Sequence, residues 1–157
     1  YVRLYKELGI DYIFDPGQQV ISFTGAELKR LIKGAKVLIG NDYEIKIILD
    51  RLKTDASNLQ KLVDILVITK GAQGSEIYSK DKAIKIKAVK VKHIIDPTGA
   101  GDAYRAGLIK GLTSGTSLQK AGQLASTIAA YAVEKQGTQV HKFTLKEFTN
   151  RYKINYK

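Results

Sequence analysis

The amino-acid sequence predicts an α/β fold built as a three-layer αβα sandwich, with helices on both faces of a parallel-type sheet. Segments with strand character alternate with segments of helix character, which is typical of this class. Residues 65–69 are apolar enough for a central parallel strand that is buried on both faces. Turn-forming and acidic residues follow four predicted strands, at 15–17, 41–44, 69–74 and 96–102. Ligands bind beyond the carboxyl ends of such strands, so we expect these segments to form one site.

The first three elements end at glycine or at a turn. Residues 1–8 are amphipathic and predict a short helix that stops at Gly9. Residues 11–15 predict a strand that a Pro-Gly pair closes. Residues 24–34 predict a helix, because they begin with the capping-box pattern Thr-Gly-Ala-Glu and place leucine and isoleucine at helical spacing.

The next three elements lead to the central strand. Residues 36–40 form a short apolar run that predicts a buried strand. Residues 41–52 predict a helix that opens with Asn-Asp-Tyr-Glu. Residues 57–60 predict a further helical turn or two before the strand at 65–69.

A hairpin-like pair and three helices complete the chain. Residues 75–79 and 83–95 predict two antiparallel strands, the second with apolar residues and lysines in alternation. Residues 103–112 predict a helix of small residues that we expect to pack closely on a neighbour, and residues 118–135 predict a long helix rich in alanine. The remaining residues predict a short helix capped at 144–147 and a polar tail at 150–157.

Composition limits the class of protein. The chain has 157 residues, the size of one ordinary domain, and its hydrophobic content of 44% argues against disorder. It contains no cysteine, which excludes disulfides and thiolate metal sites and is typical of a cytoplasmic protein. No apolar run approaches the ~20 residues that a membrane-spanning helix needs, so we expect no membrane partner.

The net charge of +11 comes from 26 Lys and Arg against 15 Asp and Glu. A charge of this size raises the hypothesis of nucleic-acid binding. The lysines are spread along the chain, however, without a basic block interleaved with aromatic residues. We therefore favour a solvated lysine-rich surface that also attracts phosphorylated small molecules, and we expect no nucleic-acid partner.

Residues 96–102, Asp-Pro-Thr-Gly-Ala-Gly-Asp, carry the clearest chemical signal. Glycines at 99 and 101 allow positive φ and bring backbone N–H groups close to a ligand, and we expect a helix to open at or just after Asp102. The donors and dipole of a helix start suit a phosphate. An acid there would repel a static phosphate, so Asp102 either caps the helix or acts as a base on the group that attacks the phosphate.

The longer run at 96–104 resembles the C-terminal signature of the ribokinase-like (PfkB) carbohydrate kinase family, Asp-x-Thr-Gly-Ala-Gly-Asp-x-Phe, with Tyr104 in place of Phe. Residues 41–44 resemble the family's Asn-x-x-Glu, and residues 69–74 resemble its Thr-x-Gly-x-x-Gly. Three ordered motifs make the resemblance specific, and it covers the chain from about Tyr12 to Phe143. The Asp-Pro-Gly-Gln and Asp-Pro-Thr segments lean towards the adenosine-kinase-like prokaryotic branch.

The resemblance implies ATP-dependent phosphoryl transfer to a hydroxymethyl group of a sugar or nucleoside, with an adenosine-like acceptor favoured. It implies that Asp102 is the catalytic base and that Gly99, Ala100 and Gly101 form the anion hole. Such chemistry needs a base beside the attacking oxygen and donors for the charge on the transferring group. Glu44 would position Mg²⁺ through water. The implied nucleotide contacts are Thr69, Lys70, Gly71, Gly74, Asn41 and Ser126.

Several of these assignments have alternatives. Asn41 and Glu44 also fit a helix cap with a first-turn acid. Ser126 stands where the family often carries Asn, which puts its contact in doubt, and we expect Arg105 to face solvent. The resemblance also implies a monovalent cation, K⁺, bound by Asp96, Thr98, Ala132 and Gly137. The alternative for Asp96 is that it ends its strand and bonds loop N–H groups.

Members of this family usually have about twice this length, beyond one domain of ordinary size. The resemblance therefore implies that residues 1–157 are the C-terminal nucleotide-binding and catalytic half, without the N-terminal strands, the lid and most of the acceptor pocket. Such a half-sheet would expose an apolar edge strand.

Three hypotheses follow. The chain is part of a sugar or nucleoside kinase that needs the missing half or a second subunit, a homodimer included. Alternatively, it is an inactive nucleotide-binding fragment of a split or truncated kinase, or a basic nucleic-acid-associated protein on a borrowed fold. The motif residues favour kinase ancestry over the third hypothesis, and composition does not separate the first two.

Overall fold

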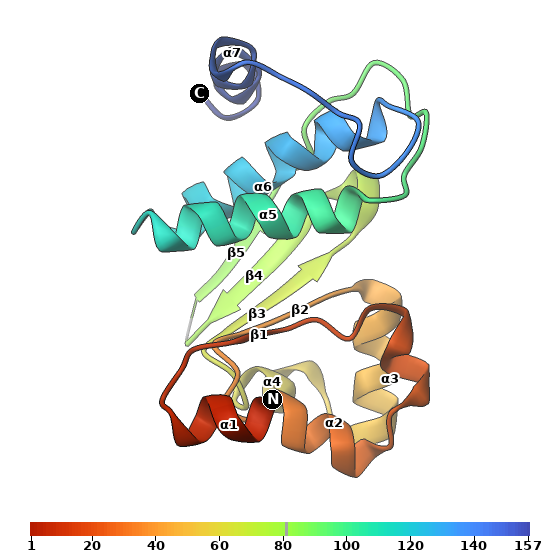
Figure 1. Ribbon diagram of the computed structural model, residues 1–157, viewed down its shortest axis with the longest axis vertical. Helices are drawn as coiled ribbons and strands as arrows, with labels where there is room; N and C mark the ends of the chain where they lie inside the picture. Colours follow the sequence, from red (N-terminus) through yellow and green to blue (C-terminus); the bar gives the residue numbers. More distant parts are fainter. Residues whose placement is uncertain (81) are drawn as a thin grey trace. The chain divides into compact units, whose positions relative to one another are not determined.

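The computed structural model describes residues 1–80 and 82–157 (Figure 1). The chain divides into two compact units. The first unit comprises Tyr1–Lys70 and Glu76–Ala83, and the second comprises Gly71–Ser75 and Ile84–Lys157. Within the described residues, no helix combines the length and apolar character that crossing a membrane requires.

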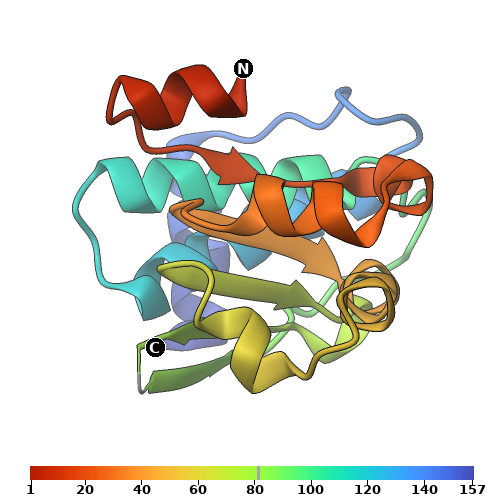
Figure 2. The same ribbon diagram turned by 90° about the horizontal axis from the view of Figure 1, so that it is seen from below.

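Five strands form a mixed sheet in the order β1-β2-β3-β4-β5 (Figure 2). They are β1 (Ile13–Phe14), β2 (Val37–Asn41), β3 (Ile65–Thr69), β4 (Ser75–Ser79) and β5 (Lys82–Ile86). β1 pairs with β2 in parallel, and so does β2 with β3, whose register places Asn41 opposite Thr69. β4 and β5 are neighbours separated by only two residues of sequence, a spacing that only an antiparallel pair allows. The carboxyl ends of β2 and β3 therefore lie side by side, as the sequence predicts.

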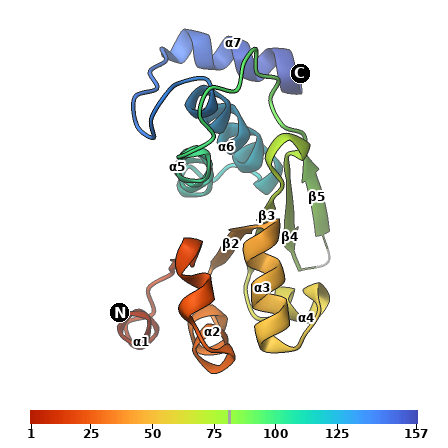
Figure 3. The ribbon, with the colours of Figure 1, turned by 90° about the vertical axis from the view of Figure 1, so that its right-hand side faces the viewer.

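Among the described residues, the first unit contains five helices, of which α2, α3 and α4 start at side-chain caps. They are α1 (Val2–Glu7), α2 (Gly25–Ile32), α3 (Asp42–Leu52), α4 (Ala56–Gln60) and the 3-10 helix η1 (Gly17–Ser22). At the start of α2, Thr24 accepts a hydrogen bond from the Glu27 N–H, and the Glu27 carboxylate accepts one from the Thr24 N–H. This capping box satisfies two donors that a helix start otherwise leaves without acceptors. Figures 1 and 3 show α2, α3 and α4 on one face of β2 and β3.

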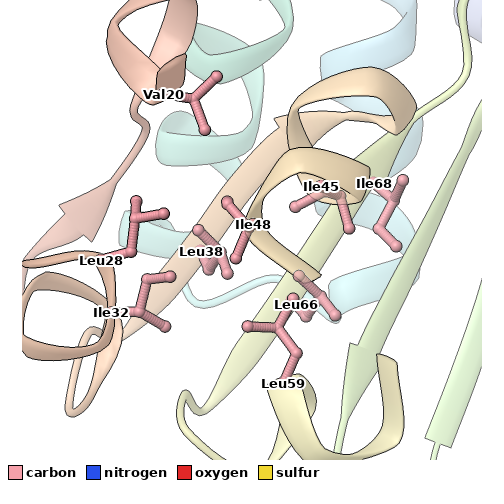
Figure 4. Close-up of a cluster of buried hydrophobic side chains, with 9 residues drawn as sticks. All are labelled: Val20, Leu28, Ile32, Leu38, Ile45, Ile48, Leu59, Leu66 and Ile68. Carbon is pink, nitrogen blue, oxygen red and sulfur yellow. The ribbon is translucent and has the colours of Figure 1, made fainter. Parts of the chain in front are cut away.

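The core of the first unit lies between these helices and the strands (Figure 4). α3 contributes Ile45 and Ile48, and the neighbouring strands β2 and β3 contribute Leu38 and Leu66. The cluster is completed by Val20, Leu28, Ile32, Leu59 and Ile68. Each fully buried side chain of this size stabilises the fold by roughly 1.5–3 kcal/mol. The cluster therefore holds the end of β2 and the start of α3, where a predicted motif lies, in a fixed position.

The second unit contains η2 (Gly71–Gln73), α5 (Ala100–Thr113), α6 (Leu118–Val133) and α7 (Leu145–Tyr156). Figures 1 and 3 show α5 and α6 side by side. A Cβ on Gly107 would lie 2.5 Å from the Cα of Ala125, and a Cβ on Gly111 would lie 2.6 Å from the Cα of Ala121. These helices approach closely because both contact points on α5 are glycine, which confirms the predicted packing of small residues.

Two predicted bounds near the glycine-rich loop are wrong. The strand predicted at 83–95 ends at Ile86, because the following residues bond to α6 instead of a neighbouring strand. The Val89 N–H donates to Ser126 Oγ at 3.3 Å, and the Ile95 N–H donates to the Val133 carbonyl at 2.8 Å. α5 begins at Ala100 and not at or after Asp102, since Gly99 is its N-cap.

The predicted polar tail at 150–157 is also wrong, because α7 continues to Tyr156. Its polar side chains have partners far along the chain. Arg151 donates to both carboxylate oxygens of Glu134 at 2.7 Å. The Tyr152 hydroxyl donates to Gln123 at 2.7 Å, and the Tyr156 hydroxyl donates to the Lys87 carbonyl at 2.6 Å. These bonds, rather than an apolar stripe, hold the last turns of α7.

Candidate active site

Asn41 and Glu44 lie at the start of α3, beyond the carboxyl end of β2. Asn41 Oδ1 accepts a hydrogen bond from the Glu44 N–H at 2.8 Å, and Glu44 Oε2 accepts one from the Asn41 N–H at 2.8 Å. The predicted alternative, a helix cap, is therefore confirmed. The cap uses one oxygen of each side chain. Asn41 Nδ2 and Glu44 Oε1 make no hydrogen bond within residues 1–80 and 82–157, so both atoms stay available to a ligand.

Lys70, which follows Thr69 at the end of β3, forms an ion pair in the first unit. Its Nζ lies 2.7 Å from Glu76 Oε2, and the two side chains are 30% and 19% exposed. The Tyr78 hydroxyl donates to the same Glu76 oxygen at 2.6 Å, and this hydrogen bond is the main reason that the pKa of Tyr78 rises to about 12. Sequence reasoning missed Glu76. The signal that could have found it is the two-residue period of β4, which places Glu76 and Tyr78 on one face.

The loop between β3 and β4 depends on Gly74. This residue has a φ of +93°, and a Cβ on it would collide with the carbonyl oxygen of Ile86. The Gly74 N–H donates to the Gly71 carbonyl at 3.0 Å, which closes the single turn of η2. No residue with a side chain fits here, so the loop backbone is held against the segment that follows β5.

Asp96 connects two loops of the second unit. Its Oδ1 accepts from the Thr98 N–H at 2.8 Å, and its Oδ2 accepts from the Gly137 N–H at 2.9 Å and from Gln136 Nε2 at 3.3 Å. The bond from Gly137, and then those from Thr98, hold the pKa of Asp96 below its ordinary value. The predicted alternative is confirmed in that Asp96 bonds loop N–H groups, but Asp96 does not end a strand, because β5 stops at Ile86. This carboxylate fixes the start of the glycine-rich loop.

The start of α5 has the donors that an anion site needs. Gly99 is the N-cap, with φ +85° and no side-chain cap, and the Ala100 N–H donates to the Pro97 carbonyl at 3.1 Å. The N–H groups of Gly101 and Asp102 have no acceptor among the described residues. Asp102 is the third residue of α5 and is not its cap, so its carboxylate belongs to the same first turn as these two donors without capping the helix. Gly101 is helical and needs no positive φ, contrary to our expectation.

The carboxylate of Asp102 forms an ion pair with Arg105, one turn further along α5. The expectation that Arg105 faces solvent is therefore met only in part, because its guanidinium also pairs with Asp102. The side chains of Asp102 and Arg105 are 66% and 32% exposed. Exposed ion pairs of this kind contribute about 0–1 kcal/mol, so a ligand can replace Arg105 as the partner of Asp102 at little cost.

The structure thus gathers the predicted residues into two groups, one in each unit. The first unit pairs Asn41 with Thr69 across β2 and β3, and Glu44 bonds to Asn41. The second unit holds the glycine loop at 71–74 and joins residues 96–102 to Gly137. The union of both groups in one site stays a prediction.

Residues 6–144 match the family described as pfkB family carbohydrate kinase, which is most of the chain. The chain belongs to this family. A nucleoside kinase of Methanocaldococcus jannaschii is 38% identical over 128 residues, which cover 82% of this chain and 42% of that protein. A nucleoside kinase of Methanothermobacter thermautotrophicus is 39% identical over 137 residues, which cover 87% of this chain and 44% of that protein.

Solved structures of nucleoside kinases confirm the predicted ribokinase-like fold. The nucleoside kinase of Burkholderia thailandensis in complex with inosine matches with a TM-score of 0.96 and 36% identity, over 99% of this chain and 52% of that one. The nucleoside kinase of M. jannaschii matches with a TM-score of 0.88 and 34% identity, over 92% of this chain and 48% of that one. The chain therefore spans about half the length of the relatives that it matches.

In this pfkB-family chain, Ser126 is engaged by backbone groups. It is 7% exposed, and its Oγ accepts from the Val89 N–H at 3.3 Å and lies 3.4 Å from the Lys87 carbonyl, to which it donates. A serine thus joins α6 to the segment after β5, at a position where the family often carries Asn. Its predicted nucleotide contact stays a prediction.

Among the described residues, no three His, Cys, Asp or Glu side chains cluster as a protein-only metal site. Mg²⁺ keeps several waters and is usually held by one or two carboxylates together with substrate phosphates. Glu44 fits that role, because its Oε1 lies outside the capping box. The K⁺ site at Asp96, Thr98, Ala132 and Gly137 stays a prediction.

Proposed function

We propose that residues 1–157 are the C-terminal nucleotide-binding and catalytic half of a nucleoside kinase of the pfkB family. In this role they take part in phosphoryl transfer from ATP to the hydroxymethyl group of a purine nucleoside such as adenosine. The named relatives are nucleoside kinases, and Burkholderia thailandensis nucleoside kinase has been solved with inosine and with ADP-inosine. These relatives favour a nucleoside over a free sugar.

The start of α5 carries this proposal. Asp102 is an acid in the first turn that does not cap the helix, and the Gly101 and Asp102 N–H groups have no acceptor in the described chain. A carboxylate beside two unpaired donors at the positive end of a helix suits a reaction in which a hydroxyl attacks a phosphoryl group. Asp102 takes the proton from that hydroxyl, and the two N–H groups stabilise the charge that develops on the phosphoryl oxygens.

The remaining residues hold the nucleotide. Lys70 and the loop at 71–74 line the phosphates, and Asn41 Nδ2 donates to a phosphate or to a metal-bound water. Mg²⁺, when bound, would neutralise phosphate charge. Glu44 would hold it through water. The acceptor pocket comes mainly from a segment equivalent to the other half of the relatives, so that turnover needs that segment.

The test uses this chain alone and in a chimera, in which it replaces the matching half of the Burkholderia kinase. We expect the chain alone to bind ADP without phosphorylating adenosine, and the chimera to phosphorylate adenosine or inosine. In the chimera, Asp102→Asn should lower kcat by roughly 10² or more and leave ADP affinity nearly unchanged. Asp55→Asn is the matched control, because Asp55 is the N-cap of α4 and Asn caps equally well.

The outcomes separate the hypotheses. Equal losses of kcat and ADP affinity in Asp102→Asn would show that Asp102 is structural. ADP binding by a folded chimera without turnover would favour the inactive nucleotide-binding fragment. Adenosine phosphorylation at an ordinary rate by the 157-residue chain alone would refute its need for the other half.

A further inference from the structure

A buried hydrogen bond joins β4 to α5 within the second unit. Ser75 Oγ and the Tyr104 hydroxyl lie 2.6 Å apart, and these residues are only 2% and 6% exposed. Burial raises the pKa of Tyr104 to about 12, so the phenol is neutral at physiological pH and either hydroxyl can donate. Both residues are buried, and a buried hydroxyl left without a partner is costly.

The two residues lie next to the two predicted functional segments of this unit. Ser75 directly follows Gly74, the last residue of the glycine loop, and Tyr104 is two residues beyond Asp102. The glycine loop is restrained at Gly74, because the backbone there lies so close to the Ile86 carbonyl that no side chain would fit. The rear of α5 is fixed as well, because Gly107 contacts α6 without a side chain between them. The bond between Ser75 and Tyr104 therefore restrains the front of α5 relative to the glycine loop.

We propose that Tyr104 is a positioning residue that couples the glycine loop at 71–74 to the first turn of α5. When a ligand suppresses local opening of one segment, local opening of the other is suppressed as well. The proposal rests on the proposed function only in naming a nucleotide as the ligand of these segments. The signature that residues 96–104 resemble has Phe at this position, and a phenylalanine cannot form the bond. The coupling is thus a property of this chain and of others with the same pair of hydroxyls.

Two backbone amides report on the coupled segments. The Gly74 N–H donates to the Gly71 carbonyl at 3.0 Å, and the Ala103 N–H donates to the Gly99 carbonyl at 2.9 Å. Hydrogen exchange of each amide requires local opening of its own segment. If the segments are coupled, removal of the shared bond must speed exchange at both amides by a similar factor.

The experiment measures hydrogen exchange by NMR in the ligand-free chain. Tyr104→Phe and Ser75→Ala each leave one hydroxyl buried without a partner, and we expect exchange at Gly74 and Ala103 to rise roughly tenfold in both variants. Tyr152→Phe is the matched control in the same unit, since it removes the 2.7 Å bond to Gln123 on α6. This control should leave exchange at Gly74 and Ala103 unchanged.

The double variant Ser75→Ala with Tyr104→Phe separates coupling from stability. Replacement of both partners by apolar groups is nearly neutral for stability. In the wild type, ADP should slow exchange at both amides. In the double variant it should slow exchange at Gly74 alone, at an unchanged midpoint of urea unfolding.

Faster exchange at Ala103 alone in Tyr104→Phe would overturn the proposal, and so would an equal rise at every amide of the second unit. ADP protection of both amides in the double variant would overturn it as well. If ADP protects neither amide of the wild type, the proposed function fails, and the ligand-free comparison still decides the coupling.

Discussion

Gly99→Ala tests how α5 begins. Gly99 has a φ of +85°, and a Cβ on it would lie 2.8 Å from the Cα of Thr138 and 2.9 Å from its carbonyl oxygen. Alanine in the left-handed conformation costs about 1–2 kcal/mol. The forced separation of the two backbone segments adds about 1–3 kcal/mol, because neither can move as a side chain would. We therefore expect the free energy of unfolding to fall by about 2–5 kcal/mol.

Gly101→Ala is the matched control two residues away. Gly101 lies inside α5, and a Cβ on it would meet no atom of its surroundings within 4 Å. Alanine is favoured over glycine inside a helix by roughly 0.5–1 kcal/mol, so this variant should be slightly more stable than the wild type. Its methyl group would enter the space beside the unpaired donors. In the proposed reaction these donors serve the transferring phosphoryl group, so we expect a lower kcat for the chimera, with ADP affinity nearly unchanged, in a more stable protein.

The assay is urea unfolding followed by circular dichroism, with ADP affinity measured by calorimetry and kcat measured in the chimera. The unfolding slope should stay constant in both variants, so that the midpoint reports stability alone. Wild-type stability of Gly99→Ala would refute the argument that the loop at Thr138 leaves no room for a side chain. A loss of stability in Gly101→Ala as large as that in Gly99→Ala would refute the assigned start of α5.

Two further predictions concern α7 and the edge of the sheet. Hydrogen bonds from Arg151 hold the pKa of Glu134 below its ordinary value of 4.5. The folded state therefore gains the full stabilisation from this pair above pH 4.5, and loses it as the pH falls through the lowered pKa. Glu134→Gln should cost about 1.5–3 kcal/mol at pH 7 and flatten this acid dependence, as read from urea midpoints between pH 3 and pH 7 at roughly unit steps. At the sheet edge, Ile13 of β1 is 36% exposed, and Ile13→Lys should raise the concentration at which the chain self-associates in light scattering. Unchanged self-association would show that another surface is responsible.

The sequence correctly predicted the elements that are stabilised by interactions between residues close in sequence. The capping box at Thr24, the strand at 65–69 and the helix that opens at Asn41 depend on neighbours within a few residues. The two parallel strands next to each other then placed Asn41 and Thr69 together, because strands of a parallel sheet present their carboxyl ends at one edge.

Distant partners decided the parts that the sequence did not predict. Residues 87–95 alternate like a strand, yet the N–H of Val89 bonds to Ser126, which lies in a helix far along the chain. Residues 150–157 look solvated, yet Arg151 pairs with Glu134 and stacks on Tyr131 with 4.6 Å between the guanidinium and the ring centroid. A local pattern carries no information about such distant partners. Periodicity therefore made the strand after residue 82 too long, and composition made the helix at the end of the chain too short.

The lysines of β5 illustrate the same limit for charge. Lys82 and Lys85 are exposed on a strand at the edge of the sheet, where unpaired backbone groups would otherwise accept a strand from another molecule. Lysine on an edge strand discourages that pairing. Part of the net charge of +11 therefore has a structural explanation that does not require a nucleic-acid partner.

Glu44 shows how one residue can cap a helix and serve a reaction, and two substitutions separate these roles. Gln at this position still accepts the hydrogen bond from the Asn41 N–H, so Glu44→Gln should keep the capping box and lose at most about 0.3–1 kcal/mol of charge–dipole stabilisation. Glu44→Ala removes the cap as well and should cost about 1 kcal/mol more in urea unfolding. Both variants lack the carboxylate, so both should raise the Mg²⁺ concentration that half-saturates turnover of the chimera, and to a similar extent. If Glu44→Gln kept the wild-type Mg²⁺ dependence while Glu44→Ala lost stability, the residue would be a helix cap and nothing more.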